Sequence, residues 1–232
     1  LALVYSELGD RETALSTGRA SLQRARELRL AYAINHASLH LSTVLLSPRP
    51  QPSPEDAVDR RTAISLAEAV LATPGTTPGF RGWARGLLAQ AQLVHDPQAA
   101  YELAQSACEL SSHAPLRRLL FSALAIEAVL AQSGSPGSVP AGAVSAADGL
   151  QQALTRIGGA AYATIPVERA LALVHAGRGD QAAARACLER AAAELRRRIA
   201  QIPEPAFKES LRLRSPDALL LQATAFALLQ AP

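Results

Sequence analysis

The chain has 232 residues, of which 49% are hydrophobic and 4% aromatic, and its formal net charge is +3. This length is long for one compact domain, and the abundant alanine and leucine favour closely packed helices, so an all-α fold is expected. The two cysteines, Cys108 and Cys187, lie too far apart in helical segments to suggest a disulfide scaffold, which indicates reduced thiols in a cytoplasmic protein. No apolar run reaches the roughly 20 residues that a membrane span needs.

Proline and glycine mark where the predicted helices begin and end. Ser53-Pro54, Thr77-Pro78, Asp96-Pro97 and Ser215-Pro216 each place a side-chain oxygen at a helix N-cap with proline next to it. Gly9-Asp10 and Gly179-Asp180 combine a left-handed glycine that closes one helix with an aspartate that caps the next. These signals predict helices over 1–8, 11–29, 31–46, 55–72, 79–94, 97–110, 115–131, 142–157, 161–177, 180–200, 205–213 and 216–229.

The apolar positions inside these segments keep helical spacing and predict the core. Within 115–131 they are Leu116, Leu119, Leu120, Ala123, Leu124, Ile126 and Leu130. From 171 onward they are Leu171, Val174, Ala184, Leu188, Ala191 and Leu195.

The tight turns recur at a regular interval. Gly9-Asp10, His95-Asp96 and Gly179-Asp180 lie about 85 residues apart, twice a period of about 42. Two long connections, 47–53 and 132–140, begin at the same spacing, so tightly and loosely joined helix pairs alternate. Self-similarity of this kind, with two helices in each unit, is typical of an α-solenoid.

The residues from Gly179 to Ala191 resemble the second half of a tetratricopeptide (TPR) repeat. A Gly-Asp turn is followed there by a small residue, a larger one and an alanine, which are Ala184, Leu188 and Ala191 here. The resemblance implies an all-α, right-handed α-solenoid of antiparallel helix pairs. We expect about five TPR-like pairs over residues 1–200 and C-terminal capping helices of the same solenoid over 201–232.

The long period is similar to that of the repeat regions of large bacterial signal-transduction proteins, which couple a nucleotide-binding module to a kinase or a DNA-binding domain. The segment Ile202 to Leu211 resembles the short helix that often ends such regions. With no methionine in the chain, we expect a piece of a larger cytoplasmic bacterial regulator that binds a protein or peptide or senses a signal. A free-standing adaptor is the alternative, and a nucleic-acid-binding helical repeat is a weaker one.

No catalytic, metal or cofactor site is predicted, and the chain is not expected to be an enzyme. His36 and His40 share one helix face, but Ala37 stands where a zinc protease has glutamate. Both cysteines are predicted to pack in the core. The arginines near the C-terminus are predicted to form a solvated helix face, because the stacking aromatics of nucleic-acid binders are missing there; they are Arg185, Arg190, Arg196, Arg197 and Arg198.

In an array of this type the first helix of each pair lines the concave groove, so polar residues of 31–46, 79–94, 115–131 and 161–177 are the candidate binding residues. Two of the arginines lie one double period apart and are predicted to occupy equivalent steps, where they would grip an acidic peptide or a carboxylate terminus. Ordinary surface arginines are the alternative. The candidates are Asn35, His36, Arg81, Arg85, Gln92, Arg117, Glu127 and Arg169, with Arg85 and Arg169 as the equivalent pair.

Overall fold

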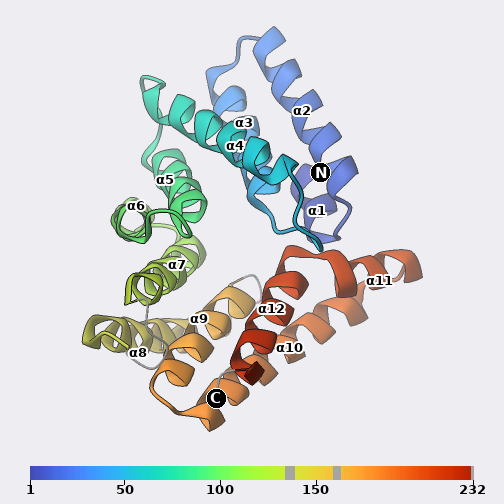
Figure 1. Cartoon of the computed structure of the whole chain (residues 1–232). Coiled ribbons are helices and arrows are strands. Elements are labelled where there is room, and N and C mark those ends of the chain that lie inside the picture. The colour runs from blue at the N-terminus through green and yellow to red at the C-terminus, as the bar shows by residue number, and fades with distance from the viewer. Residues whose placement is uncertain (134–138, 159–162, 231–232) are drawn as a thin grey trace.

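The structure, a computed structural model, describes residues 1–133, 139–158 and 163–230, with only the backbone of the last two. This part of the chain forms twelve helices and no strand (Figure 1), which confirms the all-α prediction. The helices are α1 (Ala2–Glu7), α2 (Arg11–Glu27), α3 (Ala31–Leu46), α4 (Glu55–Ala72), α5 (Pro78–Gln92), α6 (Pro97–Leu110), α7 (Pro115–Ser133), α8 (Ala141–Arg156), α9 (Thr164–Gly177), α10 (Gln181–Gln201), α11 (Pro205–Arg214) and α12 (Pro216–Gln230).

The predicted N-caps form as expected at most helix starts. The side chains of Asp10, Asp96 and Asp180 accept hydrogen bonds from the backbone N–H three residues on, at 3.1, 3.0 and 3.0 Å. Each bond satisfies a donor that the first helical turn leaves unpaired. Thr77 and Ser215 cap α5 and α12 in the same way.

The N-cap of α4 and the long connection before it differ from the other helix starts. Ser53 Oγ accepts from Glu55 N at 3.3 Å, so Ser53 bonds two residues on instead of three. The connection before α4 is tied down by Arg49, which forms ion pairs with Glu55, Asp56 and Asp59. Of the predicted connection 132–140, residues 134–138 lie outside the described residues, as do the first two of the predicted helix 161–177.

Consecutive helices pack against each other along the whole chain, as the interval between turns predicts. In addition, α3 contacts α5, α5 contacts α7, α7 contacts α9 and α9 contacts α12, so these five helices form a continuous layer. The helices α2, α4, α6 and α8 pack mainly against their neighbours in the chain. The result is a curved double row of helices (Figure 1).

The core consists mainly of alanine, leucine and valine at the predicted helical spacing. Leu119, Ala123, Ile126, Leu171 and Val174 are buried between α7, α8, α9 and α10 and confirm the predicted positions. Leu188, Leu195 and Leu120 are partly buried against this core. Leu116 is 37% exposed, so its assignment to the core is wrong; it follows Pro115 in the first turn of α7, on a side that no described helix covers.

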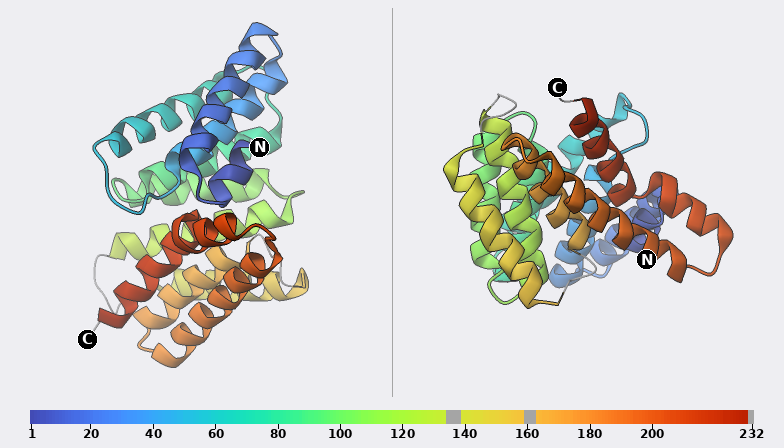
Figure 2. Two further views of the ribbon diagram at one scale, coloured as in Figure 1. Left: turned by 90° about the vertical axis from the view of Figure 1, so that its right-hand side faces the viewer. Right: turned by 90° about the horizontal axis from the view of Figure 1, so that it is seen from below.

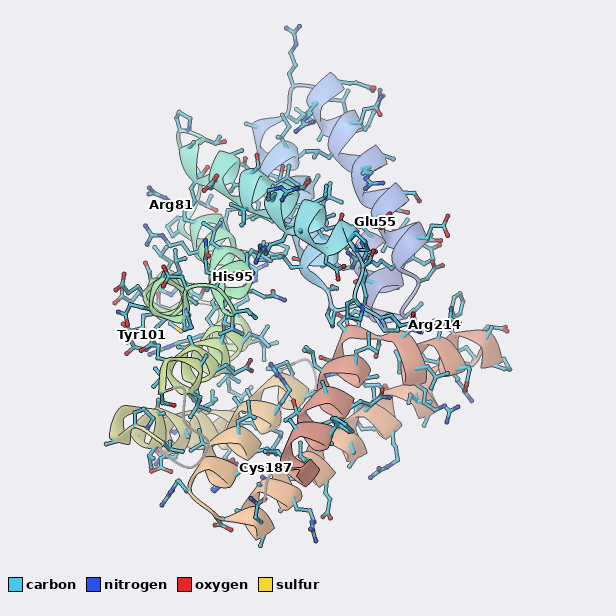
Figure 3. The ribbon with its side chains drawn as sticks, in the orientation of Figure 1. Glu55, Arg81, His95, Tyr101, Cys187 and Arg214 are labelled. Atoms are coloured by element: carbon cyan, nitrogen blue, oxygen red, sulfur yellow. The ribbon has the colours of Figure 1, made fainter. Side chains whose placement is uncertain are left out.

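The two ends of the array meet, which the sequence did not predict. The C-terminal helices return to the N-terminal ones, and α12 contacts α1 as well as α9 and α10 (Figures 1 and 2). The turn between α1 and α2 lies against the corner between α11 and α12, where a Cβ atom on Gly9 would lie 2.7 Å from Cβ of Arg214 and 2.8 Å from its carbonyl carbon. Figure 3 shows Arg214 at this corner.

Replacing Gly9 with alanine tests this contact. Gly9 has φ +78°, where a side chain is strained, and the added methyl group would also collide with backbone atoms of Arg214. We expect Gly9→Ala to lower the free energy of unfolding by about 2–3 kcal/mol in urea denaturation. Gly179→Ala is the matched control, because Gly179 has φ +80° and nothing within 4 Å, so it reports the strain alone. Equal losses in the two variants would mean that the ends do not pack together.

Candidate binding site

An aromatic patch joins three helices at one edge of the array. It consists of Tyr32, His36 and His40 of α3, Phe80 and Trp83 of α5, and Arg117 of α7. The three α3 residues are spaced four apart, so they form one stripe along the helix. The faces of α3 next to this stripe pack on α2 and α4, through Leu41 and Ser42 among others, which leaves the stripe turned towards α5.

The rings of the aromatic patch are in contact with one another. Tyr32 and Phe80 have ring centroids 5.0 Å apart, His40 and Trp83 4.9 Å, and His36 and His40 4.2 Å. The guanidinium carbon of Arg117 lies 4.5 Å from the centroid of the Trp83 ring, a cation–π geometry. Contacts of this kind hold the rings in fixed relative positions before any ligand arrives.

The aromatic patch is anchored in the core on one side and open on the other. Phe80 is 8% exposed and packs with the buried side chains of α3, α4 and α5, and Trp83 is partly buried against the same cluster. Tyr32, by contrast, is 68% exposed, and His36 is also exposed. Water-accessible aromatic side chains gathered on rigid helices are typical of a binding surface.

The two histidines of the patch are neutral at pH 7. Burial lowers the pKa of His40 to about 4, assisted by His36 and Arg117, and burial together with the Arg117 charge lowers the pKa of His36. Their Nε2 atoms lie 3.1 Å apart, so one imidazole donates its N–H to the other. Among the described residues no third histidine, cysteine or acid joins them in a group that would hold a metal ion.

The structure brings two of the eight predicted groove residues, His36 and Arg117, into the aromatic patch. The prediction that Asn35 lies on a non-core face is wrong: it is 5% exposed, and its amide donates to Thr76 Oγ1 at 3.2 Å, because α3 turns this residue towards the end of α4. Gln92 is the last residue of α5 and is half-buried, nine residues beyond Trp83. Whether the exposed candidates bind anything stays a prediction.

The arginines and the acid among the predicted residues have other neighbours. Arg81 is exposed on the side of α5 that points out of the array (Figure 3), and Arg85 donates to Ser106 Oγ on α6. Arg169 of α9 pairs with the buried Glu127 of α7. Arg85 and Arg169 therefore do not occupy equivalent steps. Arg85 contacts α6, the next helix in the chain, whereas Arg169 contacts α7, which belongs to the same layer as its own helix α9.

Three members of the patch, Tyr32, Phe80 and Trp83, were missed at the sequence level. Phe80 and Trp83 are three apart and so share a helix face, and Tyr32 extends the His36/His40 spacing by one turn. That periodicity was available in the sequence. The sequence does not show that the Tyr32 face of α3 and the Trp83 face of α5 meet, because that contact depends on how α3 and α5 cross.

Ion pairs with buried or partly buried carboxylates link the helices of the C-terminal half. Arg190 of α10 makes a bidentate bond to Glu168 of α9, which is 3% exposed, with distances of 2.7 and 2.8 Å. Arg198 of α10 bonds Glu194 of its own helix and Asp217 of α12. Since each pair closes within the fold, these side chains stabilise helix packing and are not free for a ligand.

Glu7 of α1 faces this network across the contact between the chain ends. Burial is the main cause that raises its pKa from 4.5 to about 7; the Asp217 carboxylate also raises the pKa, and Arg198 lowers it. An acid whose pKa is raised on folding destabilises the fold once it ionises, so stability is lost as pH rises from about 4.5 to 7 and then levels off.

We therefore expect Glu7→Gln to stabilise the protein at pH 8 by about 2 kcal/mol and to have almost no effect at pH 4. Urea denaturation at the two pH values measures the difference. The same substitution at the exposed Glu12 of α2 serves as the control and should have little effect at either pH. A Glu7→Gln effect that does not depend on pH would contradict the placement of this carboxyl group at the contact between the chain ends.

The two cysteines lie in different environments. Cys187 is 1% exposed, which confirms its core position, and burial raises its pKa to about 11. The prediction for Cys108 is wrong, because its side chain is only half-buried and lines a groove between α6 and α8. Its Sγ atom lies 3.5 Å from Ser122 Oγ.

Comparison with protein-family models, with curated proteins and with solved structures found no match to this chain. None of the helices in the described ranges is both long enough and apolar enough to cross a membrane.

Proposed function

We propose that this chain is a non-catalytic helical-repeat module whose aromatic patch binds an extended peptide or protein segment. The observation that carries the proposal is the set of contacting rings of Tyr32, His36, His40, Phe80 and Trp83, with Arg117 across Trp83. Rigid aromatic side chains contribute large contact area at a small entropic cost. The peptide would stack a proline or aromatic side chain against Tyr32 and Trp83 and place a carboxylate near Arg117.

In this proposal the array is a right-handed, TPR-like solenoid of antiparallel pairs, and the patch lies along its concave groove. Support comes from the packing of consecutive helices and from the continuous layer formed by α3, α5, α7 and α9. The module would belong to a larger cytoplasmic bacterial regulator in which it senses a signal or docks a partner. A free-standing adaptor would use the same patch.

The pairing of the C-terminal arginines weighs against a nucleic-acid-binding repeat. Arg190, Arg197 and Arg198 each form an ion pair with a glutamate of α9 or α10. The glutamates already neutralise part of the charge that phosphate binding would use.

Selection of short linear peptides displayed on phage tests the proposal. Peptides enriched on the natural chain should share a proline or aromatic residue next to an acidic one. Their affinity should fall more than about tenfold with Trp83→Ala or Arg117→Ala. Arg81→Ala is the matched control, since this arginine is exposed on the same helix as Trp83 but lies outside the patch. Enriched peptides that bind Trp83→Ala as tightly as the natural chain would refute the assignment.

A further inference from the structure

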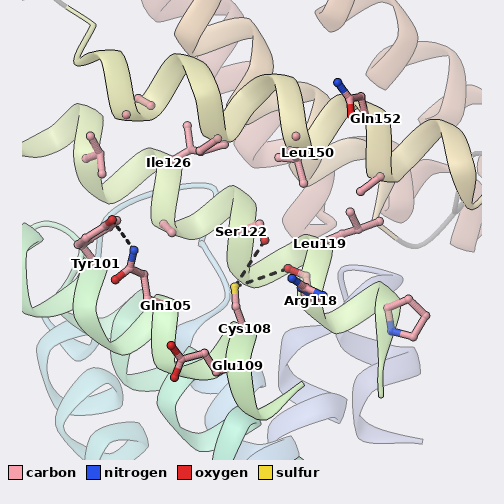
Figure 4. A pocket seen from close by; sticks show the side chains of 18 of the residues that line it. Tyr101, Gln105, Cys108, Glu109, Arg118, Leu119, Ser122, Ile126, Leu150 and Gln152 are labelled. Carbon is pink, nitrogen blue, oxygen red and sulfur yellow. Dashed lines mark hydrogen bonds between the residues drawn. The ribbon is translucent and has the colours of Figure 1, made fainter. Parts of the chain in front are cut away.

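A long groove lies on the other side of α7, away from the aromatic patch. Its floor is α7, from Pro115 to Val129, and its walls are α6 and α8, which both pack on α7 and stand on either side of it (Figure 4). The volume is about 970 Å³. At 1.5 Å per helical residue, the lined stretch of α7 makes the groove about 20 Å long.

The α8 side of the groove is lined by small side chains, so the groove reaches close to the helix backbone. Gly142, Ala146, Gly149 and Ala153 follow one another at three- and four-residue intervals and all line the groove. A Cβ atom built on Gly149 would meet nothing within 4 Å, so space is open in front of the helix backbone. A partner with large side chains can approach such a wall closely.

The floor is apolar over most of its length. Leu119 and Ile126 are buried there, and Ala125 and Val129 are partly exposed towards the groove. Tyr101 and Gln105 of α6 form the opposite rim, and Figure 4 shows them at the Ile126 end. An apolar trough with a polar rim has the composition of a protein-binding surface.

The charges of the groove are placed asymmetrically. Figure 4 shows Arg118 of α7 and Gln152 of α8 both on the Leu119 side of the view, and Arg156 lies one turn beyond Gln152, to which its Nη2 donates at 3.4 Å. Among the described residues neither Arg118 nor Arg156 forms an ion pair. Glu109 of α6, the remaining charged residue of the lining, lies near Cys108 as Arg118 does. Two arginines and one glutamate therefore give this end of the groove a net positive charge, which attracts carboxylates.

The length and the lining of the groove point to the kind of occupant. A length of about 20 Å corresponds to roughly four turns of an α-helix. Gly142, Ala146, Gly149 and Ala153 recur at three- and four-residue intervals, the spacing at which side chains of one helix pack between those of another. A helix in this position buries one face and leaves the other in water, which is how an amphipathic helix binds.

We infer that this groove between α6 and α8 is a second docking site, which receives an amphipathic helix of a partner protein with large aliphatic or aromatic residues on its buried face. Carboxylates near one end of that helix meet Arg118 and Arg156. The site is independent of the aromatic patch, so the module would hold two partner segments at once.

A displayed library of helix-forming peptides, randomised along one face, provides the probe. Peptides enriched on the natural chain should carry large apolar residues at i, i+3, i+4 and i+7 and acidic residues near one end. Gly149→Phe fills the groove and replaces a helix-interior glycine in open space, so the fold should be retained, as circular dichroism and urea denaturation will show. It should weaken the enriched peptides more than about tenfold.

Two further measurements separate this site from the proposed peptide site. Trp83→Ala should leave the helical peptides bound, whereas Arg118→Glu/Arg156→Glu should weaken them and enrich basic peptides in a repeated selection. Bound peptide should also slow iodoacetamide modification of Cys108, followed by mass spectrometry, because this thiol lines the α6 wall of the groove. The inference is overturned if no helical peptide is enriched, if the enriched peptides lack the helical spacing, or if Gly149→Phe binds them unchanged.

Discussion

Replacement of Gly86 with valine is expected to lower the free energy of unfolding by about 3 kcal/mol, the upper end of the usual cost of overpacking. Gly86 is buried in α5, where a Cβ atom would lie 2.0 Å from Cε1 of Phe121 on α7. The Phe121 ring is itself 8% exposed and has little room to move. This close approach of α5 and α7 continues the layer of alternate helices, so the variant tests the packing that defines the array.

Urea denaturation monitored by circular dichroism measures the change, and two variants complete the test. Gly149→Ala places the same type of change in a helix interior with open space, so it should stabilise the chain by up to about 1 kcal/mol. Adding Phe121→Leu to Gly86→Val should recover part of the loss, because a smaller side chain makes room. A loss below about 0.5 kcal/mol in Gly86→Val would show that α5 and α7 do not meet at this position.

The second large effect is expected for Arg169→Met, which should cost about 3–5 kcal/mol because it leaves the Glu127 carboxylate buried without its partner. Glu127 is 8% exposed, and burial already raises its pKa although Arg169 lowers it. In the double variant Glu127→Gln/Arg169→Met the buried charge is gone, and much of the loss should be recovered. A double variant as unstable as the single one would mean that the cost comes from lost packing of Arg169.

The sign of the pH dependence gives an independent test of the same pair. Without Arg169 the pKa of Glu127 rises further, and an acid with a raised pKa is tolerated in the folded state when it is protonated. The deficit of Arg169→Met relative to the natural chain should therefore shrink as pH falls and grow as pH rises. Urea denaturation at several pH values measures it, and a deficit that does not vary with pH would contradict the account.

This pair also changes how the predicted groove residues are to be tested. A binding variant that reverses Arg169 would place two acids in contact in the interior, so loss of binding would report unfolding. Arg117 can be replaced more safely, because its guanidinium lies over Trp83 and forms no ion pair among the described residues.

Local chemistry explains why the helices could be predicted so closely. The caps at Asp10, Asp96 and Asp180 and the left-handed glycines at 9 and 179 depend only on residues next to one another in the chain. The stripe of small and apolar residues in each helix then predicts the buried face, as Ala184 and Ala191 show. Such features can be predicted from the sequence without any knowledge of the rest of the fold.

Features that depend on how distant helices meet could not be predicted in this way. The partner of Arg169 lies 42 positions earlier in the chain, and the contact between Gly9 and Arg214 joins the two ends of the array. The aromatic patch likewise requires the ends of α3, α5 and α7 to come together. Residues at helical spacing show that they share one face of a helix, but only the packing of the helices shows which residues that face contacts.

Fluorescence of Trp83 tests the peptide-binding proposal most directly, because it is the only tryptophan in the chain and lies in the centre of the proposed site. A peptide enriched on the natural chain, and itself free of tryptophan, would be titrated into the protein. We expect a saturable blue shift of the Trp83 emission, and a loss of binding in the Arg117→Ala variant. Binding that saturates by calorimetry while the Trp83 emission stays unchanged would place the peptide elsewhere and contradict the account.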